Sequence, residues 1–322
     1  MVFMLIRAGQ TAGVLLAAAL VSFLLFRFVG DPVNNIVGQG ASVEERAATR
    51  EALGLNDPAI VQFSRFVGRA VQGEFGVSYR FSQPVADLIG QRLPATAELT
   101  LAAMLVALGL GVPLGMWTAI KPRGVLTQTL LTLSLIGVAL PTFLIGIVLI
   151  LVFSVWLGWL PAFGRGAVTN LGWWTTGLLT TSGLRALILP ALTLGLFQMT
   201  LIMRMVRSEM LEILRSDHIR FSRARGLRRP ALIYRHAFRN ALTPLVTIVG
   251  LQFGNVFAFS IVVETVFQWP GLGLLVIQAI QFADVPLLAA YLLLVALTFA
   301  LINLAVDLVN AVIDPRIRQE AL

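Results

Sequence analysis

The residues able to do chemistry in this sequence are few, and their spacing does not build a catalytic or metal site. The two histidines, His218 and His236, stand far from any HExxH pattern, cysteine is absent, and no GxSxG pattern occurs. The one lysine, Lys121, is followed by Pro122 rather than by Ser or Thr, so the phosphate-binding P-loop is missing as well. We therefore expect no enzyme activity, no metal site and no cofactor in this chain.

Positive charge, in contrast, is concentrated in one segment. Residues 204–239 contain ten of the chain's Arg and only three acidic residues. Within this segment Leu211, Leu214, His218 and Phe221 recur every three or four residues, which predicts an amphipathic helix with one apolar stripe. The chemistry available to such a helix is electrostatic binding rather than catalysis.

Two residues predict the end of this basic helix and the start of the next one. Gly226 suits the left-handed cap that closes many helices, and Pro230 can open a second short helix that reaches Arg239 and Asn240. A basic helix–turn–helix of this kind either rests on anionic lipid or docks a cytoplasmic partner. The residues alone leave both interpretations open.

The elements that carry this segment are expected to be membrane helices. The chain has 322 residues, 57% hydrophobic and 12% charged, with a mean hydropathy of +0.86, which is not the composition of a soluble protein. A helix needs about 20 apolar residues to cross the hydrocarbon core of a bilayer. Uncharged runs of about this length or more cover residues 8–26, 99–120, 124–164, 186–203, 240–263 and 285–306.

Two of the uncharged stretches need interpretation. Residues 124–164 are long enough for one long span or for a hairpin that turns near Pro141, and residues 265–283 are broken at Trp269, Pro270 and Gly271. We interpret the second stretch as a loop with a short half-helix. A single span in the first stretch places the Arg-rich segment on the same side as Arg7 and Lys121, as the positive-inside rule favours.

The prediction is therefore an all-α integral membrane protein with six transmembrane helices and both termini in the cytoplasm. In this topology fifteen of the 24 Lys and Arg lie inside, eight lie outside, and Arg27 sits at the outer boundary. That distribution explains the net charge of +8 without any nucleic acid. The first run is expected to be retained as a span rather than cleaved as a signal peptide.

Several motifs, in order along the chain, carry a family resemblance. The stretch Asp217–Leu227, followed by Tyr234–Pro244, resembles the coupling loop of permeases of binding-protein-dependent ABC importers, in the dipeptide and oligopeptide branch. Further motifs of that family are matched by Gly73–Ser78, Arg92–Leu99, Glu264–Phe267, Trp269–Gly273 and Asp314–Arg316. The resemblance covers the chain from about Phe3 to Arg318.

The resemblance implies a fold, a division of labour and a set of partners. The fold would be that of a type I ABC importer permease, which passes substrate while one or two separate ATPase subunits bind ATP and Mg. The other implied partners are a second, homologous permease subunit and a periplasmic substrate-binding protein. Gly109, Gly111 and Gly115 permit close helix packing, for which the second subunit is one candidate partner. The location would be the bacterial inner membrane.

The family organisation divides the chain into four parts. Residues 1–29 form an N-terminal tail and the first span, and residues 30–95 a periplasmic segment. Residues 96–310 form the permease core, with the coupling loop at 204–240, and residues 311–322 a cytoplasmic tail.

The resemblance also assigns candidate sites. The coupling loop, through which movement of the ATPase is transmitted to the helices, would consist of Arg220, Phe221, Ser222, Arg223, Ala224, Arg225, Gly226 and Leu227. An outer gate facing the binding protein would contain Glu264, Trp269, Pro270 and Gly271. The sequence departs from the general Glu-Ala-Ala pattern of the loop at Arg220, Phe221 and Ser222, and Phe221 is bulkier than the residue usual there.

A second class of function competes with this one. An ion-coupled secondary carrier of a small solute would also be an apolar multi-span protein, and such carriers usually hold an acidic residue at mid-membrane depth. None of the six uncharged runs contains a carboxylate, which favours the permease. Members of the resembling family take up dipeptides, oligopeptides, glutathione, metal complexes, opines or sugars, and the sequence does not choose among them.

Overall fold

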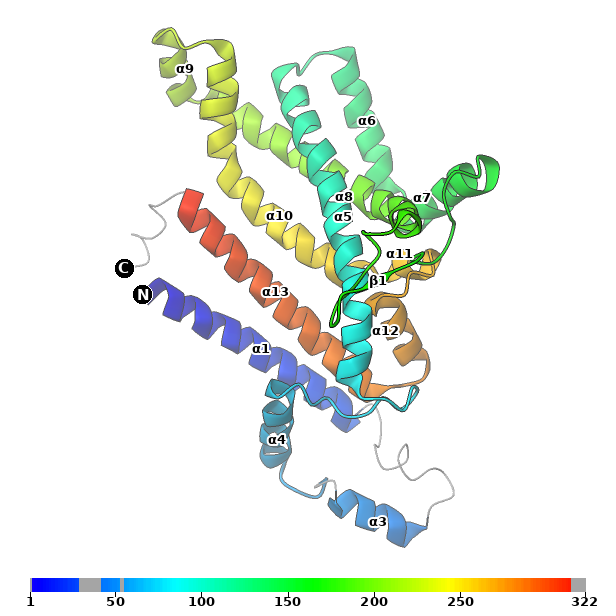
Figure 1. The fold of residues 1–322 in the computed structure, drawn as a ribbon. Helices are drawn as coiled ribbons and strands as arrows, with labels where there is room; N and C mark the ends of the chain where they lie inside the picture. The colour runs from blue at the N-terminus through cyan, green and yellow to red at the C-terminus, as the bar shows by residue number, and fades with distance from the viewer. Residues whose placement is uncertain (1, 29–41, 53–54, 314–322) are drawn as a thin grey trace.

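A computed structural model describes residues 2–28, 42–52 and 55–313 of the chain. The expected cytoplasmic tail from residue 314 onward, with its Asp-Pro-Arg motif, lies outside the described residues, as do residues 30–41 of the expected periplasmic segment. The described part is a bundle of long helices (Figure 1).

The first half of the chain contains seven described helical segments. In order, they are α1 (Val2–Phe28), α3 (Val43–Ala52), α4 (Ala59–Val71), α5 (Val85–Ile120), α6 (Val125–Ala139), α7 (Thr142–Leu149) and the π-helical segment η1 (Ile150–Trp156). A two-stranded antiparallel hairpin comes next, formed by β1 (Thr169–Asn170) and β2 (Thr175–Thr176).

The second half continues with helices only, within the described residues. They are α8 (Thr181–Arg215), α9 (Asp217–Ala224), the π-helical segment η2 (Ala231–Phe238), α10 (Arg239–Phe259), α11 (Ile261–Val266), α12 (Leu272–Gln281) and α13 (Val285–Ile313). The short α12 is the half-helix expected after Trp269-Pro270-Gly271, and that prediction is confirmed.

The closest packing in the bundle is between α5 and α8, and it explains the glycines of α5. A Cβ at Gly115 would lie 2.7 Å from the backbone oxygen of Met203, and one at Gly111 would lie 2.9 Å from that of Met199, so only glycine allows the two backbones to approach this closely. Gly109 has no atom near its Cβ position. The prediction that these glycines permit close packing is confirmed for Gly111 and Gly115, and their packing partner is α8 of the same chain rather than a second subunit.

The directions of the packed helices determine which parts of the chain lie at the same end of the bundle. Helices α5 and α8 are parallel, whereas α1 and α13 are antiparallel, since Arg7 pairs with Asp307 at 3.0 Å and Ser22 donates to the carbonyl of Ala289. Helices α10 and α13 are antiparallel as well, as the contacts of Asn310 with Thr247 and of Tyr291 with Ala258 show. We call the end that carries α9 the α9 end, and the opposite one the α12 end (Figure 1).

The α9 end gathers the positive charges that the sequence placed on one side of the membrane. It carries Arg7 near the start of α1, Lys121 after the end of α5, and the Arg-rich segment. Because α5 and α8 point the same way, residues 121–180 cross the bundle an odd number of times. The prediction that residues 124–164 contribute one crossing rather than a hairpin agrees with this geometry.

The spans are less uniform than hydropathy predicts. Within the described residues, four helices are long and apolar enough to cross a membrane: Val85–Ile120, Thr181–Arg215, Ala231–Val266 and Val285–Ile313. The pair Val125–Ala139 and Thr142–Trp156 becomes a fifth crossing if it is one span, but it is bent by 106° at the break before Pro141 and Thr142. The break falls at Pro141, which has no amide hydrogen with which to continue the helix.

Candidate functional site

The centre of the Arg-rich segment forms the short helix α9, which two long helices hold away from the spans. Helix α8 has 35 residues and the continuous helix Ala231–Val266 has 36, whereas about 20 residues suffice to cross the hydrocarbon core. At about 1.5 Å per residue, the excess carries α9 roughly 20 Å beyond that core. The α9 helix is thus connected at both ends to long helices that continue through the bundle (Figure 1).

The buried face of α9 differs from the predicted one. Helix α8 ends at Arg215 and Ser216 is extended, with φ −66° and ψ 153°. The chain therefore changes direction between the first and second pairs of the predicted stripe. Ile219 and Ser222 are buried, whereas His218 and Phe221 are exposed, so the stripe Leu211, Leu214, His218 and Phe221 was wrong beyond Leu214.

The turn after α9 has the predicted form. Gly226 has a φ of +82°, the left-handed conformation that glycine adopts without steric cost. Its amide donates to the carbonyl of Arg223 at 3.0 Å. The next helical segment, η2, begins at Ala231 directly after Pro230, and both local predictions are confirmed. Instead of stopping at Asn240, however, this helix runs on into α10 without a break.

The outward face of α9 carries the exposed aromatic ring of Phe221 and several exposed arginines. Phe221 is 65% exposed, and the guanidinium of Arg225 lies 5.8 Å from the centre of its ring. Arg220 pairs with Asp217 at 3.4 Å on the surface, and Arg223, Ala224 and Leu227 are exposed too. Because the Phe221 ring points away from the core, its bulk costs no packing within the chain. Ser222 is the one residue of the expected docking turn that is buried.

A contact between the two histidines was not predicted. The ring centres of His218 in α9 and His236 in η2 lie 5.9 Å apart, with the planes tilted by 55°. The helical hairpin brings them together although they are far apart in the sequence, and no short-range spacing indicates this. Among the described residues, no group of three His, Cys, Asp or Glu could hold a metal ion.

The residues expected at an outer gate form a buried network at the α12 end. One carboxylate oxygen of Glu264 accepts hydrogen bonds from the hydroxyls of Thr96 and Ser260, at 2.7 and 3.0 Å. The other accepts from the backbone amides of Gly273 and Leu274, at 2.7 and 3.1 Å. Four donors thus hold a carboxylate that is fully buried, and two of them are amides of the first turn of α12.

The loop between Glu264 and α12 is fastened to α5. The Trp269 indole donates to the carbonyl of Ala95 at 2.9 Å, and the Leu272 amide donates to the Thr96 hydroxyl at 2.8 Å. A side chain at Gly271 would overlap Thr96 and Glu264. Trp269 is only 1% exposed. The structure therefore places Glu264, Trp269 and Gly271 inside the chain rather than on a surface that a partner could touch, and Pro270 is half-buried.

A second buried charge at the α12 end was missed in the sequence. Arg165 donates to Glu98 at 2.7 Å, and both side chains are almost completely buried. The guanidinium also donates to the hydroxyl and the carbonyl of Thr175. This pair fastens the loop that carries the β1–β2 hairpin to α5. The two residues are 67 positions apart in the sequence, and each one taken alone looks like an ordinary surface charge. The ion pair was therefore not predicted.

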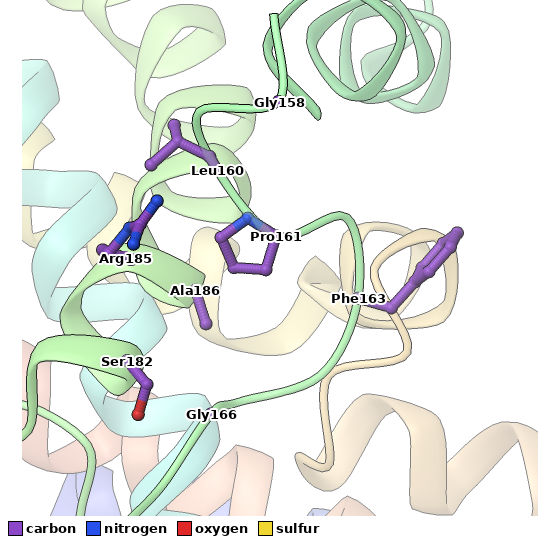
Figure 2. Close-up of a pocket in the computed structure, with 8 residues that line it drawn as sticks. All are labelled: Gly158, Leu160, Pro161, Phe163, Gly166, Ser182, Arg185 and Ala186. Atoms are coloured by element: carbon purple, nitrogen blue, oxygen red, sulfur yellow. The ribbon is translucent and has the colours of Figure 1, made fainter. Parts of the chain in front are cut away.

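The loop before α8 and the first turns of α8 line an open pocket with a volume of about 370 Å³ (Figure 2). Its walls are Gly158, Leu160, Pro161, Phe163, Gly166, Ser182, Arg185 and Ala186. Arg185, the one charged residue in this lining, donates to the carbonyl of Trp159. The pocket is therefore mainly apolar and contains no acid–base pair for catalysis.

The geometry now defines a class of protein: a multi-span helical membrane protein in which a short basic helix projects between two long spans. A family model described as "Binding-protein-dependent transport system inner membrane component" matches residues 111–319. A second model, for the N-terminal part of such membrane components, matches residues 1–100. The chain belongs to this family of binding-protein-dependent transport system inner membrane components.

Curated relatives cover nearly the whole chain. The dipeptide transport system permease protein DppB of Alkalihalophilus pseudofirmus is 39% identical over 95% of this chain and 96% of its own length. A putative peptide transport system permease protein of Brucella abortus is 37% identical, with 98% of each chain covered. The glutathione transport system permease protein GsiC of Escherichia coli is 38% identical over 93% of this chain and 94% of its own.

A solved structure shares the fold. The chain resembles an inward-facing structure of the methionine ABC transporter MetNI with a TM-score of 0.52 and 21% identity. The match covers 68% of this chain and 93% of the other. At this level of identity the likeness supports the architecture of the helices and nothing finer.

Proposed function

We propose that this chain is the membrane-spanning permease subunit of an ATP-driven importer that passes peptides or similar small solutes from a periplasmic binding protein into the cytoplasm. The proposal rests on one observation: α9 is an exposed basic helix connected to two long helices that run through the bundle. The family and the curated relatives named as dipeptide, peptide and glutathione permeases support the substrate class.

In this proposal the α9 end faces the cytoplasm of a bacterial inner membrane, and both termini lie on that side. The positive charges at the α9 end agree with that orientation. The chain crosses six times: the four long spans, the bent pair as one span, and α1, whose apolar stretch Gly9–Leu25 has about the minimum length for crossing.

Energy comes from separate ATPase subunits, one or two of them, which bind ATP and Mg and close against α9. Phe221 would enter a cleft on the ATPase, and the arginines around it would pair with acidic groups at the cleft rim. Force applied to α9 reaches the spans through packed side chains, since Ile219 of α9 and Met210 of α8 belong to the same buried cluster as Leu99 of α5. Mechanical transmission of this kind requires no catalytic residue within the chain.

The translocation pathway is proposed to run along α10, between this chain and a second, homologous permease. Asn255 is exposed on α10, with its amide 3.5 Å from the side-chain oxygen of Gln252, and Thr247 is exposed two turns earlier. Polar groups on a span are costly in lipid and usually face water or protein. This face therefore suits an aqueous path better than the bilayer.

The outer gate is proposed to be the loop 267–271, which is hydrogen-bonded to α5 through the Ala95 carbonyl and the Thr96 hydroxyl. In this arrangement Glu264 and Trp269 position the loop, and the exposed Gln268, with half-buried Pro270, provides its contact with the binding protein. Breaking the hydrogen bonds between this loop and α5 would allow α12 to move at the outer surface.

The alternative, an ion-coupled carrier, is less consistent with the buried carboxylates. Glu98 is ion-paired with Arg165 through one of its two oxygens and Glu264 is held by four donors, so both carboxylates already have compensating partners within the chain. The experiment that separates the two functions is uptake into vesicles that contain the full set of permease, ATPase and binding-protein subunits. The permease requires ATP for uptake, whereas uptake driven by an ion gradient without ATP would establish the carrier.

We expect Gly226→Val to uncouple ATP hydrolysis from uptake while leaving the protein in the membrane. The left-handed φ of +82° costs a side-chain-bearing residue about 1–2 kcal/mol, and the turn relaxes to avoid that cost. Measurement of uptake per ATP hydrolysed should show a several-fold loss. Gly226→Asn is the matched control, because Asn tolerates this conformation and should keep most of the coupling; equal coupling in both variants and the parent would contradict the role of the turn.

A further inference from the structure

Helix α4 has an apolar face that is wider than its contact with the rest of the chain. Phe63 and Phe66 of α4 pack on Phe23 of α1, with ring centres 5.5 and 6.2 Å away. Ile60 and Val71 extend the same face around the helix, yet they are 74% and 83% exposed. At about 100° per residue, these four side chains with Val67 occupy less than half of the helical circumference.

The opposite face of α4 carries both arginines of the helix, with Val61 beside them. It carries Arg65, which pairs with Asp57 at 3.0 Å, and Arg69, which is exposed. Helix α3, its neighbour in the same segment, has no comparable apolar face, because its sequence VEERAATREA is dominated by charge and alanine. The apolar face is therefore a property of α4 and not of the whole segment.

The position of α4 indicates what covers this face. Phe23 lies near the outer end of the apolar stretch Gly9–Leu25 of α1, and α4 lies beside that end of α1 (Figure 1). The side of α1 that carries Leu20, Val21 and Leu24 is exposed and, on a membrane span, faces lipid. The uncovered face of α4 is thus at the depth where the hydrocarbon of the bilayer gives way to headgroups.

We propose that α4 is an interfacial helix that inserts Ile60, Val67 and Val71 into the outer leaflet and holds the outer end of α1 in the bilayer. An amphipathic helix with arginines on its polar face is suited to this position, because its apolar side chains reach the acyl boundary while its guanidinium groups remain among phosphates. The anchor supplements α1, whose apolar stretch is shorter than the four long spans. This role is separate from ATP coupling, although the assignment to the outer leaflet rests on the orientation given under the proposed function.

The absence of cysteine makes a direct test possible. Single variants Ile60→Cys, Val71→Cys and Arg69→Cys of the full chain are labelled with a polarity-sensitive fluorophore in nanodiscs of phosphatidylethanolamine and phosphatidylglycerol. Nitroxide-labelled lipid should quench the fluorophore at positions 60 and 71, and iodide in the buffer should quench position 69 at least about fivefold more strongly than either. Arg69→Cys is the matched control, because it lies on the other face of the same helix.

Two results would overturn the proposal. Equal quenching by iodide at all three positions, with none by nitroxide lipid, would place the whole of α4 in water. Protection of positions 60 and 71 from iodide only after the substrate-binding protein is added, again without lipid quenching, would make the face a protein-docking surface instead.

Discussion

Arg165→Met is expected to lower the free energy of unfolding by about 3–5 kcal/mol, the usual cost of leaving one member of a buried ion pair without its partner. Glu98 would keep only the amide of Gly177, at 3.4 Å, in place of the guanidinium at 2.7 Å. The loop of the β1–β2 hairpin would also lose its two hydrogen bonds from Arg165 to Thr175. Equilibrium unfolding of the purified chain in mixed detergent micelles measures this loss.

The double variant Glu98→Met with Arg165→Met is the control for charge. Removing both members leaves no member of this pair buried without its partner, so most of the stability should return. A single variant as stable as the parent would show that the pair does not hold the loop, and a double variant no better than the single one would show that packing, rather than charge, is lost.

Phe221→Asp is expected to weaken binding of the partner ATPase about 30-fold, with uptake falling in parallel. Exposed aromatic anchors at the centre of an interface commonly contribute about 2 kcal/mol or more, and about 1.4 kcal/mol corresponds to a tenfold change in affinity. The new carboxylate would also neutralise part of the positive rim formed by Arg220, Arg223 and Arg225. Binding of purified ATPase subunits to the reconstituted permease gives the value directly.

Phe163→Asp provides the matched control, because Phe163 is 61% exposed and belongs to the loop before α8, remote from α9. It should leave ATPase affinity unchanged. Unaltered affinity in Phe221→Asp, or the same loss in both variants, would remove Phe221 from the docking surface.

The parts of the fold that local residues determine were predictable. Gly226 and Pro230 were correctly interpreted as the end of one helix and the start of the next, because a left-handed cap and a proline at a helix start act within a few residues. Hydropathy located the apolar stretches, and Trp269-Pro270-Gly271 predicted the break before α12. The grouping of Arg7, Lys121 and the Arg-rich segment was expected from charge alone.

The features that depend on contacts distant in sequence were not predictable. The apolar stripe was extended through Ser216, where the chain leaves the axis of α8 and begins a new helix with another buried face, so Ile219 was overlooked. The pairing of Glu98 with Arg165 and the contact of His218 with His236 exist only after the helices pack. No motif separates a glycine that meets α8 from one that would meet another subunit.

Glu264 shows where residue type and structure have to be combined. As an ionisable residue near the end of a span it was a functional candidate by its chemistry. Two of its four donors are backbone amides at the start of α12, and no residue type encodes these. In the proposed outer gate this network would make Glu264 a positioning residue, and residue type alone could not have suggested that role.

The central claim, that α9 lies in the cytoplasm within reach of the ATPase, is tested most directly by labelling an engineered cysteine with a membrane-impermeant thiol reagent. Ala224→Cys is the suitable variant because Ala224 is exposed, whereas Ser222 nearby is buried. Trp173→Cys, at an 87% exposed position in the hairpin of the α12 end, reports the opposite side. We expect the thiol of Ala224→Cys to be protected in intact cells and labelled in inverted vesicles, with the thiol of Trp173→Cys showing the reverse; labelling of Ala224→Cys in intact cells would contradict the cytoplasmic placement of α9.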